Sequence, residues 1–184
     1  MDLGRPTEIE RKFLAEMPSA DWLESRPGHT ERHIVQTYVI DGRPGETRVR
    51  QIGEGGQVRF VRTHKEGTGI ARIEEEEDIS EAEAMRLLER ADAARSPVEK
   101  IRHVIPSGGH DIEIDVYPWD GSHCVFEIEL ASEDEEYLIP EGLRPIAEVT
   151  EFSEFKNGSL AKGIPEDGLL GLYRRIAGTS PLTN

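Results

Sequence analysis

Apolar and polar residues alternate along most of this chain with a period of two, as they do in half-buried β-strands. In such a segment successive side chains point to opposite faces of the sheet. Near the start, Glu8, Glu10 and Lys12 point one way, while Ile9 and Phe13 point the other. The same alternation predicts further strands at 34–40, 46–52, 57–65, 72–79, 98–105, 111–117 and 125–130.

Fewer segments show the spacing of a helix. Ser80 and Glu83 form a capping box ahead of apolar residues at helical spacing, and Ser132 and Glu135 form a second one, which predicts a short helix. A third helix is predicted over 166–177. About eight strands and two or three helices, joined mostly by hairpins, imply an α+β fold with a large antiparallel sheet.

The polar faces of these strands carry like-sign charges in pairs, two residues apart. Like charges on one strand are unfavourable unless opposite charges lie across from them. A sheet closed into a barrel with charges inside would place basic strands opposite acidic ones, and a solvated outer face is the alternative. The pairs are Glu8/Glu10, Arg48/Arg50, Glu74/Glu76, Lys100/Arg102, Glu113/Asp115 and Glu127/Glu129.

Composition narrows the choice of partners. The 184 residues fit one domain, taken as 1–184, and include 22 Lys and Arg against 37 Asp and Glu, a formal net charge of −15. This charge disfavours nucleic acid and anionic membranes as partners. A polyanion site would need locally concentrated basic residues, or metal cations held by carboxylates. Cys124 is the only cysteine, and neither a secretory signal nor a membrane-spanning stretch is visible, so we expect a cytoplasmic protein.

The order of these charged motifs resembles the CYTH superfamily, the triphosphate tunnel metalloenzymes. The opening Glu8-Ile9-Glu10-Arg11-Lys12 matches the Glu-x-Glu-x-Lys motif of that family, and the resemblance extends from about residue 7 to residue 160. It implies an eight-stranded antiparallel β-barrel that forms a charged tunnel, with a few flanking helices. A core of about 7–160 would then be followed by a C-terminal helical tail, 161–184, which would cover the barrel or make a homodimer contact. The later motifs are Glu46-Thr47-Arg48-Val49-Arg50, Lys65, 72–76, 99–102, 113–116, 126–130, 148–150 and 155–157.

The resemblance also implies roles, and each suits the chemistry of its side chain. Arginine and lysine bind phosphate oxygens through charge-assisted hydrogen bonds, although they are more often ordinary surface residues. Carboxylates need a cation between themselves and phosphate, and Mg²⁺ or Mn²⁺ prefers oxygen ligands. The expected phosphate ligands are Arg48, Arg50, Lys65, Lys100, Arg102 and Lys156. The expected metal ligands are Glu8, Glu10, Glu127 and Glu129, with Glu74, Glu76 and Asp115 as supporting acids.

Lys12 and Tyr38 match a lysine–tyrosine couple that short bacterial members of the family place near the scissile phosphate, and we expect them to be catalytic. Core packing is the alternative for Tyr38. The chain departs from the family at Glu154 and Phe155, where a basic residue and a tyrosine are common, so only Lys156 of that closing segment is a phosphate candidate.

The function expected from the resemblance is metal-dependent hydrolysis of inorganic tripolyphosphate to pyrophosphate and phosphate. Three alternatives remain open. Two are enzymes on the same fold, a class IV-type adenylate cyclase and a thiamine triphosphatase. The third is a non-catalytic module that binds polyphosphate. No residues in the sequence identify an adenine pocket.

Overall fold

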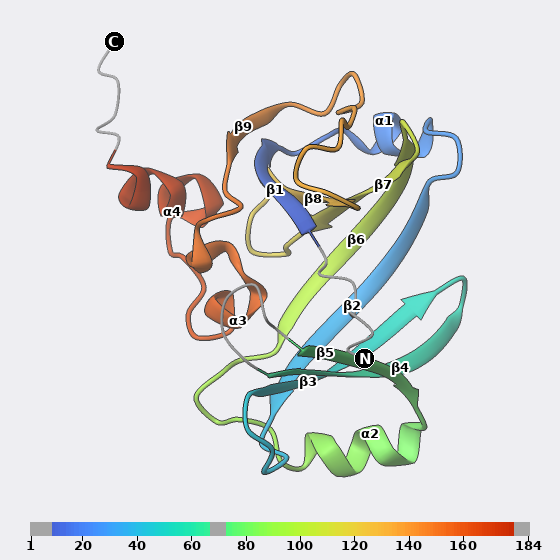
Figure 1. The fold of residues 1–184 in the computed structure, drawn as a ribbon, viewed down its shortest axis with the longest axis vertical. Coiled ribbons are helices and arrows are strands. Elements are labelled where there is room, and N and C mark those ends of the chain that lie inside the picture. Colours follow the sequence, from blue (N-terminus) through green and yellow to red (C-terminus); the bar gives the residue numbers. More distant parts are fainter. Residues whose placement is uncertain (1–8, 67–72, 179–184) are drawn as a thin grey trace.

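The computed structural model of the chain describes residues 9–66 and 73–178. It contains one sheet and several short helices (Figure 1). The strands are β1 (Ile9–Glu16), β2 (Thr30–Val39), β3 (Glu46–Glu54), β4 (Gln57–Glu66), β5 (Ile73–Ile79), β6 (Val98–Ser107), β7 (His110–Val116), β8 (His123–Leu130) and β9 (Pro145–Glu148). The helices are α1 (Ala20–Glu24), α2 (Glu81–Leu88), α3 (Asn157–Leu160), α4 (Gly168–Ala177) and a 3-10 turn, η1 (Ser153–Phe155).

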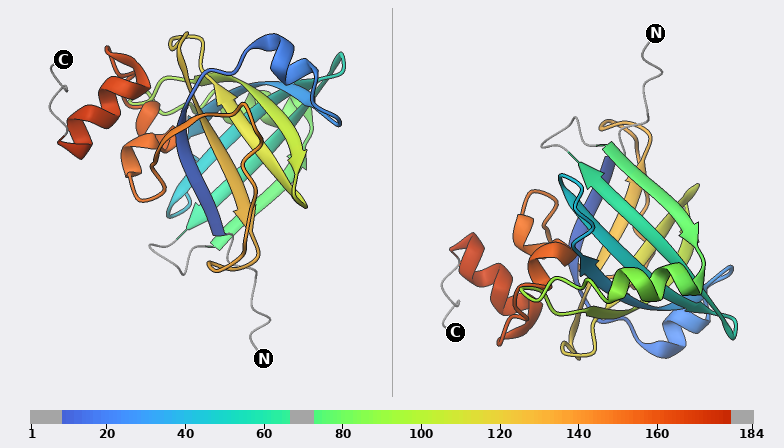
Figure 2. Two further views of the ribbon diagram at one scale, coloured as in Figure 1. Left: turned by 90° about the horizontal axis from the view of Figure 1, so that it is seen from above. Right: turned by 90° about the horizontal axis from the view of Figure 1, so that it is seen from below.

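The nine strands form one antiparallel sheet in the order β5-β4-β3-β2-β6-β7-β8-β1-β9, which curls strongly (Figures 1 and 2). The α+β prediction is confirmed, and every predicted strand is present. The closed eight-stranded barrel is not confirmed, because in the sheet formed by residues 9–66 and 73–178 β5 and β9 are two open edges. The additional strand, β9, has only four residues and begins at Pro145, so it is too short to show an alternating pattern.

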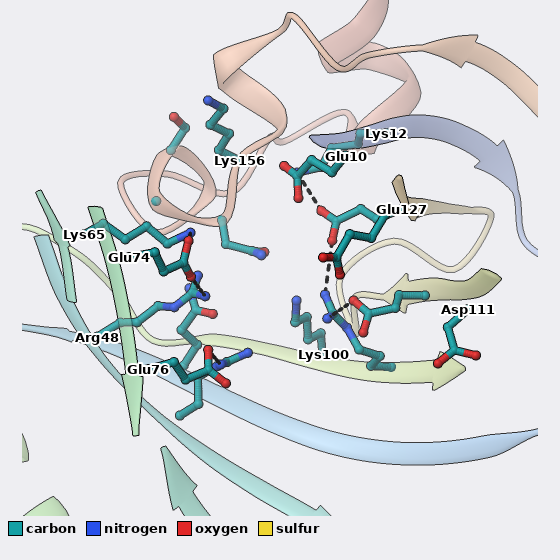
Figure 3. A pocket seen from close by; sticks show the side chains of 18 of the residues that line it. Glu10, Lys12, Arg48, Lys65, Glu74, Glu76, Lys100, Asp111, Glu127 and Lys156 are labelled. Carbon is teal, nitrogen blue, oxygen red and sulfur yellow. Dashed lines mark hydrogen bonds and ion pairs between the residues drawn. The ribbon is translucent and has the colours of Figure 1, made fainter. Parts of the chain in front are cut away.

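The alternation predicted from the sequence separates two faces of the curled sheet. Phe13 and Phe126 lie on the outer face of β1 and β8, and their rings stack with centroids 4.9 Å apart. This outer face packs against α1 and the loop 131–144, and a second apolar cluster joins α2 to β2–β4. Because apolar residues occupy much of the outer face, the charged residues that alternate with them point to the concave side (Figure 3).

The helix predictions have mixed outcomes. α2 begins as expected, since the Ser80 hydroxyl accepts a hydrogen bond from the Glu83 amide at 3.2 Å. α4 also forms, two residues later than predicted, and ends at Gly178 in the left-handed conformation, with φ 65°. The helix predicted after Ser132 is wrong: this segment is irregular, and the Glu135 carboxylate binds the Ala131 amide and His110 instead.

None of the helices within residues 9–66 and 73–178 has the length and apolar content that a membrane span requires. At one end of the sheet, the segment that contains η1, α3 and the start of α4 packs on Tyr38, Val98 and Val125. Figure 1 shows α3 and α4 beside this end. The C-terminal segment therefore covers the part of the sheet that carries Tyr38.

Candidate active site

The concave side of the sheet encloses a cavity of about 1050 Å³ (Figure 3). Charged side chains from β1 and from β3 to β8 line it, together with two uncharged residues of β2 and residues of the segment 153–162. Of the residues predicted from the sequence, those that line the cavity are Glu10, Lys12, Tyr38, Arg48, Arg50, Lys65, Glu74, Glu76, Lys100, Arg102, Glu127, Glu129 and Lys156. Asp115 lies buried behind the lining, and Glu8 lies outside the described residues.

One wall of the cavity is formed by β3, β4 and β5. Lys65 Nζ lies 2.7 Å from a Glu74 oxygen, and Arg50 Nη2 donates to Glu76 at 2.5 Å. Arg48 contacts Glu74 more loosely, at 3.8 Å. The Nε atoms of both arginines are buried and have no hydrogen-bond partner within the described part of the chain. Buried donors of charged groups are unfavourable without an acceptor, so this wall is suited to an anion.

The opposite wall centres on Asp115, which is 1% exposed. Its carboxylate accepts two hydrogen bonds from Arg102, at 2.7 and 2.8 Å, and one from Lys100 at 2.5 Å. Burial alone would raise the pKa of Asp115, but these two cations outweigh it and hold the pKa well below its usual range. Burial and the neighbouring Arg102 lower the pKa of Lys100 to about 8. Asp115, expected as a supporting acid, thus pairs with two of the phosphate candidates, Lys100 and Arg102.

Lys12, on β1, forms an ion pair with a glutamate of the neighbouring strand β8. Its Nζ lies 2.7 Å from Glu127 and 4.0 Å from Glu10. Burial would lower the pKa of Lys12, but the two glutamates outweigh burial and raise it, so the lysine is charged at neutral pH. No hydrogen bond within the described residues joins Lys12 to Tyr38. The two members of the predicted couple line the same cavity.

Two carboxylates in the lining face each other on neighbouring strands. Glu10 of β1 lies directly opposite Glu129 of β8 in the sheet. Like charges in directly opposed positions repel unless a cation lies between them, and carboxylate oxygens are the ligands that Mg²⁺ and Mn²⁺ prefer. The pair therefore fits a divalent cation. No set of three potential ligands is already arranged for a metal ion within 9–66 and 73–178.

Tyr38 lies near the end of β2, where its side chain is 3% exposed. Its hydroxyl accepts a hydrogen bond from Gln36 Nε2 at 2.7 Å. Burial raises the pKa of Tyr38, partly opposed by Arg48, so the hydroxyl keeps its proton at neutral pH. Lys156 lines the same cavity and is exposed at its rim.

Several residues of the site were not predicted. Gln36, Glu46 and Lys162 line the cavity, as do His110 and Glu135 at the β7 end. Gln36 had a signal in the sequence, because it lies two residues before Tyr38 and therefore on the same strand face. Lys162 follows a four-residue helix, where no period in the sequence indicates the direction of a side chain.

Comparison with known proteins finds similar solved structures, but no matching family model or curated sequence. Two crystal structures of the protein NE1496 match the chain. The first, described as a hypothetical protein, has a TM-score of 0.54 and 27% identity, over 86% of this chain and 100% of that one. The second, described as the inorganic triphosphatase NE1496, has a TM-score of 0.55 and 26% identity, over 86% and 97%. The predicted resemblance to the triphosphate tunnel enzymes is thereby confirmed.

Proposed function

We propose that this protein is a divalent-metal-dependent hydrolase that cleaves inorganic tripolyphosphate into pyrophosphate and phosphate. The observation that carries the proposal is the charged cavity, in which cations from two opposed walls surround space for a polyanion. Arg48, Arg50 and Lys65 would bind phosphate oxygens from one wall, and Lys100 and Arg102 from the other. The likeness to an inorganic triphosphatase supports the assignment.

Glu10 and Glu129 are the residues that would hold a divalent cation, with Glu127 beside them and Glu8 as a further candidate. A cation bound there would neutralise phosphate charge and supply an activated water. Lys12, held by Glu127, would stabilise negative charge on the leaving phosphate oxygen. Tyr38 would contribute a hydroxyl from the lining of the same cavity.

The lining favours a substrate without an organic group. Tyr38 is the only Phe, Tyr or Trp among the described residues that line the cavity. An adenine or thiamine ring would need apolar or aromatic surface to stack on, because ring recognition relies on such contacts. The cavity supports an inorganic chain better than it supports ATP or thiamine triphosphate.

The test is phosphate release from tripolyphosphate, ATP and thiamine triphosphate, with Mg²⁺ or Mn²⁺ and with EDTA. Of the three substrates, we expect only tripolyphosphate to be hydrolysed fast. Its hydrolysis should stop when EDTA removes the metal. Arg50→Ala should lower kcat/KM on the order of 100-fold. The matched control, Arg59→Ala, removes an exposed arginine paired with Asp78 and should change little.

The alternatives give different results in the same assay. Equal turnover of the three substrates would contradict the inorganic assignment, and cyclic AMP from ATP would indicate a cyclase. Metal-dependent binding of tripolyphosphate without turnover would indicate a binding module.

A further inference from the structure

The hydrogen bond at the Tyr38 hydroxyl runs in a defined direction. The Gln36 amide donates and the phenol oxygen accepts, at 2.7 Å, with Gln36 only 1% exposed. This is the only hydrogen bond of that hydroxyl within the described residues. Because the oxygen accepts from Gln36, its proton remains available for an acceptor in the cavity.

The ring of Tyr38 is held from a second side by Arg95, which does not line the cavity. The guanidinium carbon lies 4.6 Å from the ring centroid, a cation–π arrangement. Arg95 is fixed in turn by Glu46 at 2.5 Å and by Asp92 at 3.4 Å. These two acids come from different parts of the chain, so the guanidinium has little freedom to leave the ring.

A third contact comes from α3. A Cβ atom at Gly158 would lie 3.4 Å from the Tyr38 oxygen and 3.3 Å from a Glu46 oxygen. The backbone of α3 thus passes directly beside the hydroxyl. Gln36, Arg95 and α3 thus contact Tyr38 from different sides, and the tyrosine still lines the cavity.

We propose that Gln36 and Arg95 are positioning residues that hold Tyr38 as a hydrogen-bond donor to a phosphate oxygen of the bound triphosphate. This inference rests on the proposed function and adds two residues to it. Gln36 fixes the direction of the phenol proton, and Arg95 fixes the plane of the ring. Tyr38 itself contacts the substrate, whereas Gln36 and Arg95 act through it.

The first experiment is a double-mutant cycle on kcat. Gln36→Glu replaces the donor by a carboxylate that captures the phenol proton, so kcat should fall on the order of 100-fold, as in Tyr38→Phe. In the Tyr38→Phe background Gln36→Glu should have less than about a twofold effect, because no proton remains to capture. An equal loss in both backgrounds would mean that the added charge repels phosphate directly, and would overturn the role of Gln36.

The second experiment follows the ring with ¹³C-labelled tyrosine. The chain has four tyrosines, and Tyr38→Phe identifies the resonance. Arg95→Met should raise the pKa of Tyr38 and lower kcat about tenfold with a smaller change in KM, and Arg95→Lys should restore part of both. The control, Arg62→Met, removes an arginine that pairs with Glu77 and Glu83 outside the cavity, and should change neither.

The two readouts separate the failure of this inference from that of the proposed function. If no triphosphate is hydrolysed or bound, Tyr38 has no phosphate to donate to, and both the proposed function and the positioning role are wrong. If tripolyphosphate is hydrolysed but Arg95→Met leaves the Tyr38 resonance and kcat unchanged, only the positioning role is wrong.

Discussion

Lys100 shows how the environment of one residue sets the behaviour of the site. It is 2% exposed, and its pKa is lowered to about 8 by burial and by Arg102. Below that pH the lysine carries its charge and would attract the proposed phosphate ligand; above it the charge is lost, while Asp115 remains paired with Arg102. Binding of tripolyphosphate should therefore weaken as the pH rises through about 8.

We predict that Lys100→Arg removes this part of the pH dependence, because arginine stays charged throughout. Isothermal titration with a nitrogen-bridged tripolyphosphate analogue that resists hydrolysis, at a fixed metal concentration between pH 7 and 9.5, should show affinity falling by up to about tenfold per pH unit in the unmodified protein, and less in the variant. The variant also controls for titration of the ligand itself. Identical pH profiles would contradict the role given to Lys100.

Asp115 supports a prediction about stability. Asp115→Asn would leave Lys100 and Arg102 without their shared buried charge, so we expect a loss of about 3–5 kcal/mol in the free energy of unfolding. Urea unfolding measures it. Asp78→Asn is the matched control: Asp78 pairs with Arg59 at 3.1 Å, but its side chain is 77% exposed, and exposed pairs contribute about 0–1 kcal/mol. Similar losses in the two variants would refute the structural role of Asp115.

At the scale of elements, the strands were predictable because alternate residues of each strand face either the apolar outer side or the charged concave side of the sheet. Arg48 and Arg50 face the cavity for the same reason that Val49, between them, is buried under α2. The helix predicted after Ser132 failed because its capping glutamate, Glu135, has a distant partner in His110. Arg95 could not be found either, since it lies between α2 and β6, where the chain has no periodic pattern.

The start of α4 depends on a side chain far away in the sequence. Asp120 Oδ2 accepts a hydrogen bond from the Leu169 amide at 2.7 Å, and Oδ1 accepts from the Ser122 and His123 amides at 3.0 Å. Burial would raise the pKa of Asp120, but these amides outweigh it and lower the pKa. Its contribution to stability is therefore present at neutral pH, and is lost as the pH falls below the ordinary range of an aspartate.

We predict that Asp120→Ala destabilises the protein by about 2–3 kcal/mol and accelerates amide hydrogen exchange at Leu169, since a buried acceptor of several hydrogen bonds is lost. Asp167→Ala is the control, because Asp167 precedes α4 but makes no capping hydrogen bond with its side chain. Unchanged exchange at Leu169 in the Asp120 variant would mean that Asp120 does not fix the start of α4.

For the whole molecule, the central fact is that a chain of net charge −15 encloses a cavity lined by clustered cations, where we propose that a polyanion binds. The six cations of the two walls and β1 are all paired with carboxylates, as in Arg50 with Glu76 and Lys65 with Glu74. A phosphate that takes one of these cations leaves a carboxylate without its partner. Binding should then be favourable only when a divalent cation supplies the missing positive charge.

The resulting prediction is that metal and triphosphate stabilise the fold together far more than separately. With a nitrogen-bridged tripolyphosphate analogue that resists hydrolysis, Mg²⁺ and analogue at about 100 times Kd should add about 2.7 kcal/mol, or roughly 5–10 °C in Tm for a chain of this size. Mg²⁺ without the analogue, or the analogue with EDTA, should shift Tm by much less. Glu129→Gln should abolish the joint effect, and Glu77→Gln, an exposed glutamate on the outer face of β5, should preserve it. If the analogue with EDTA stabilised the protein fully, the wall cations would be free to bind phosphate without metal, and the pairing seen in the cavity would not control binding.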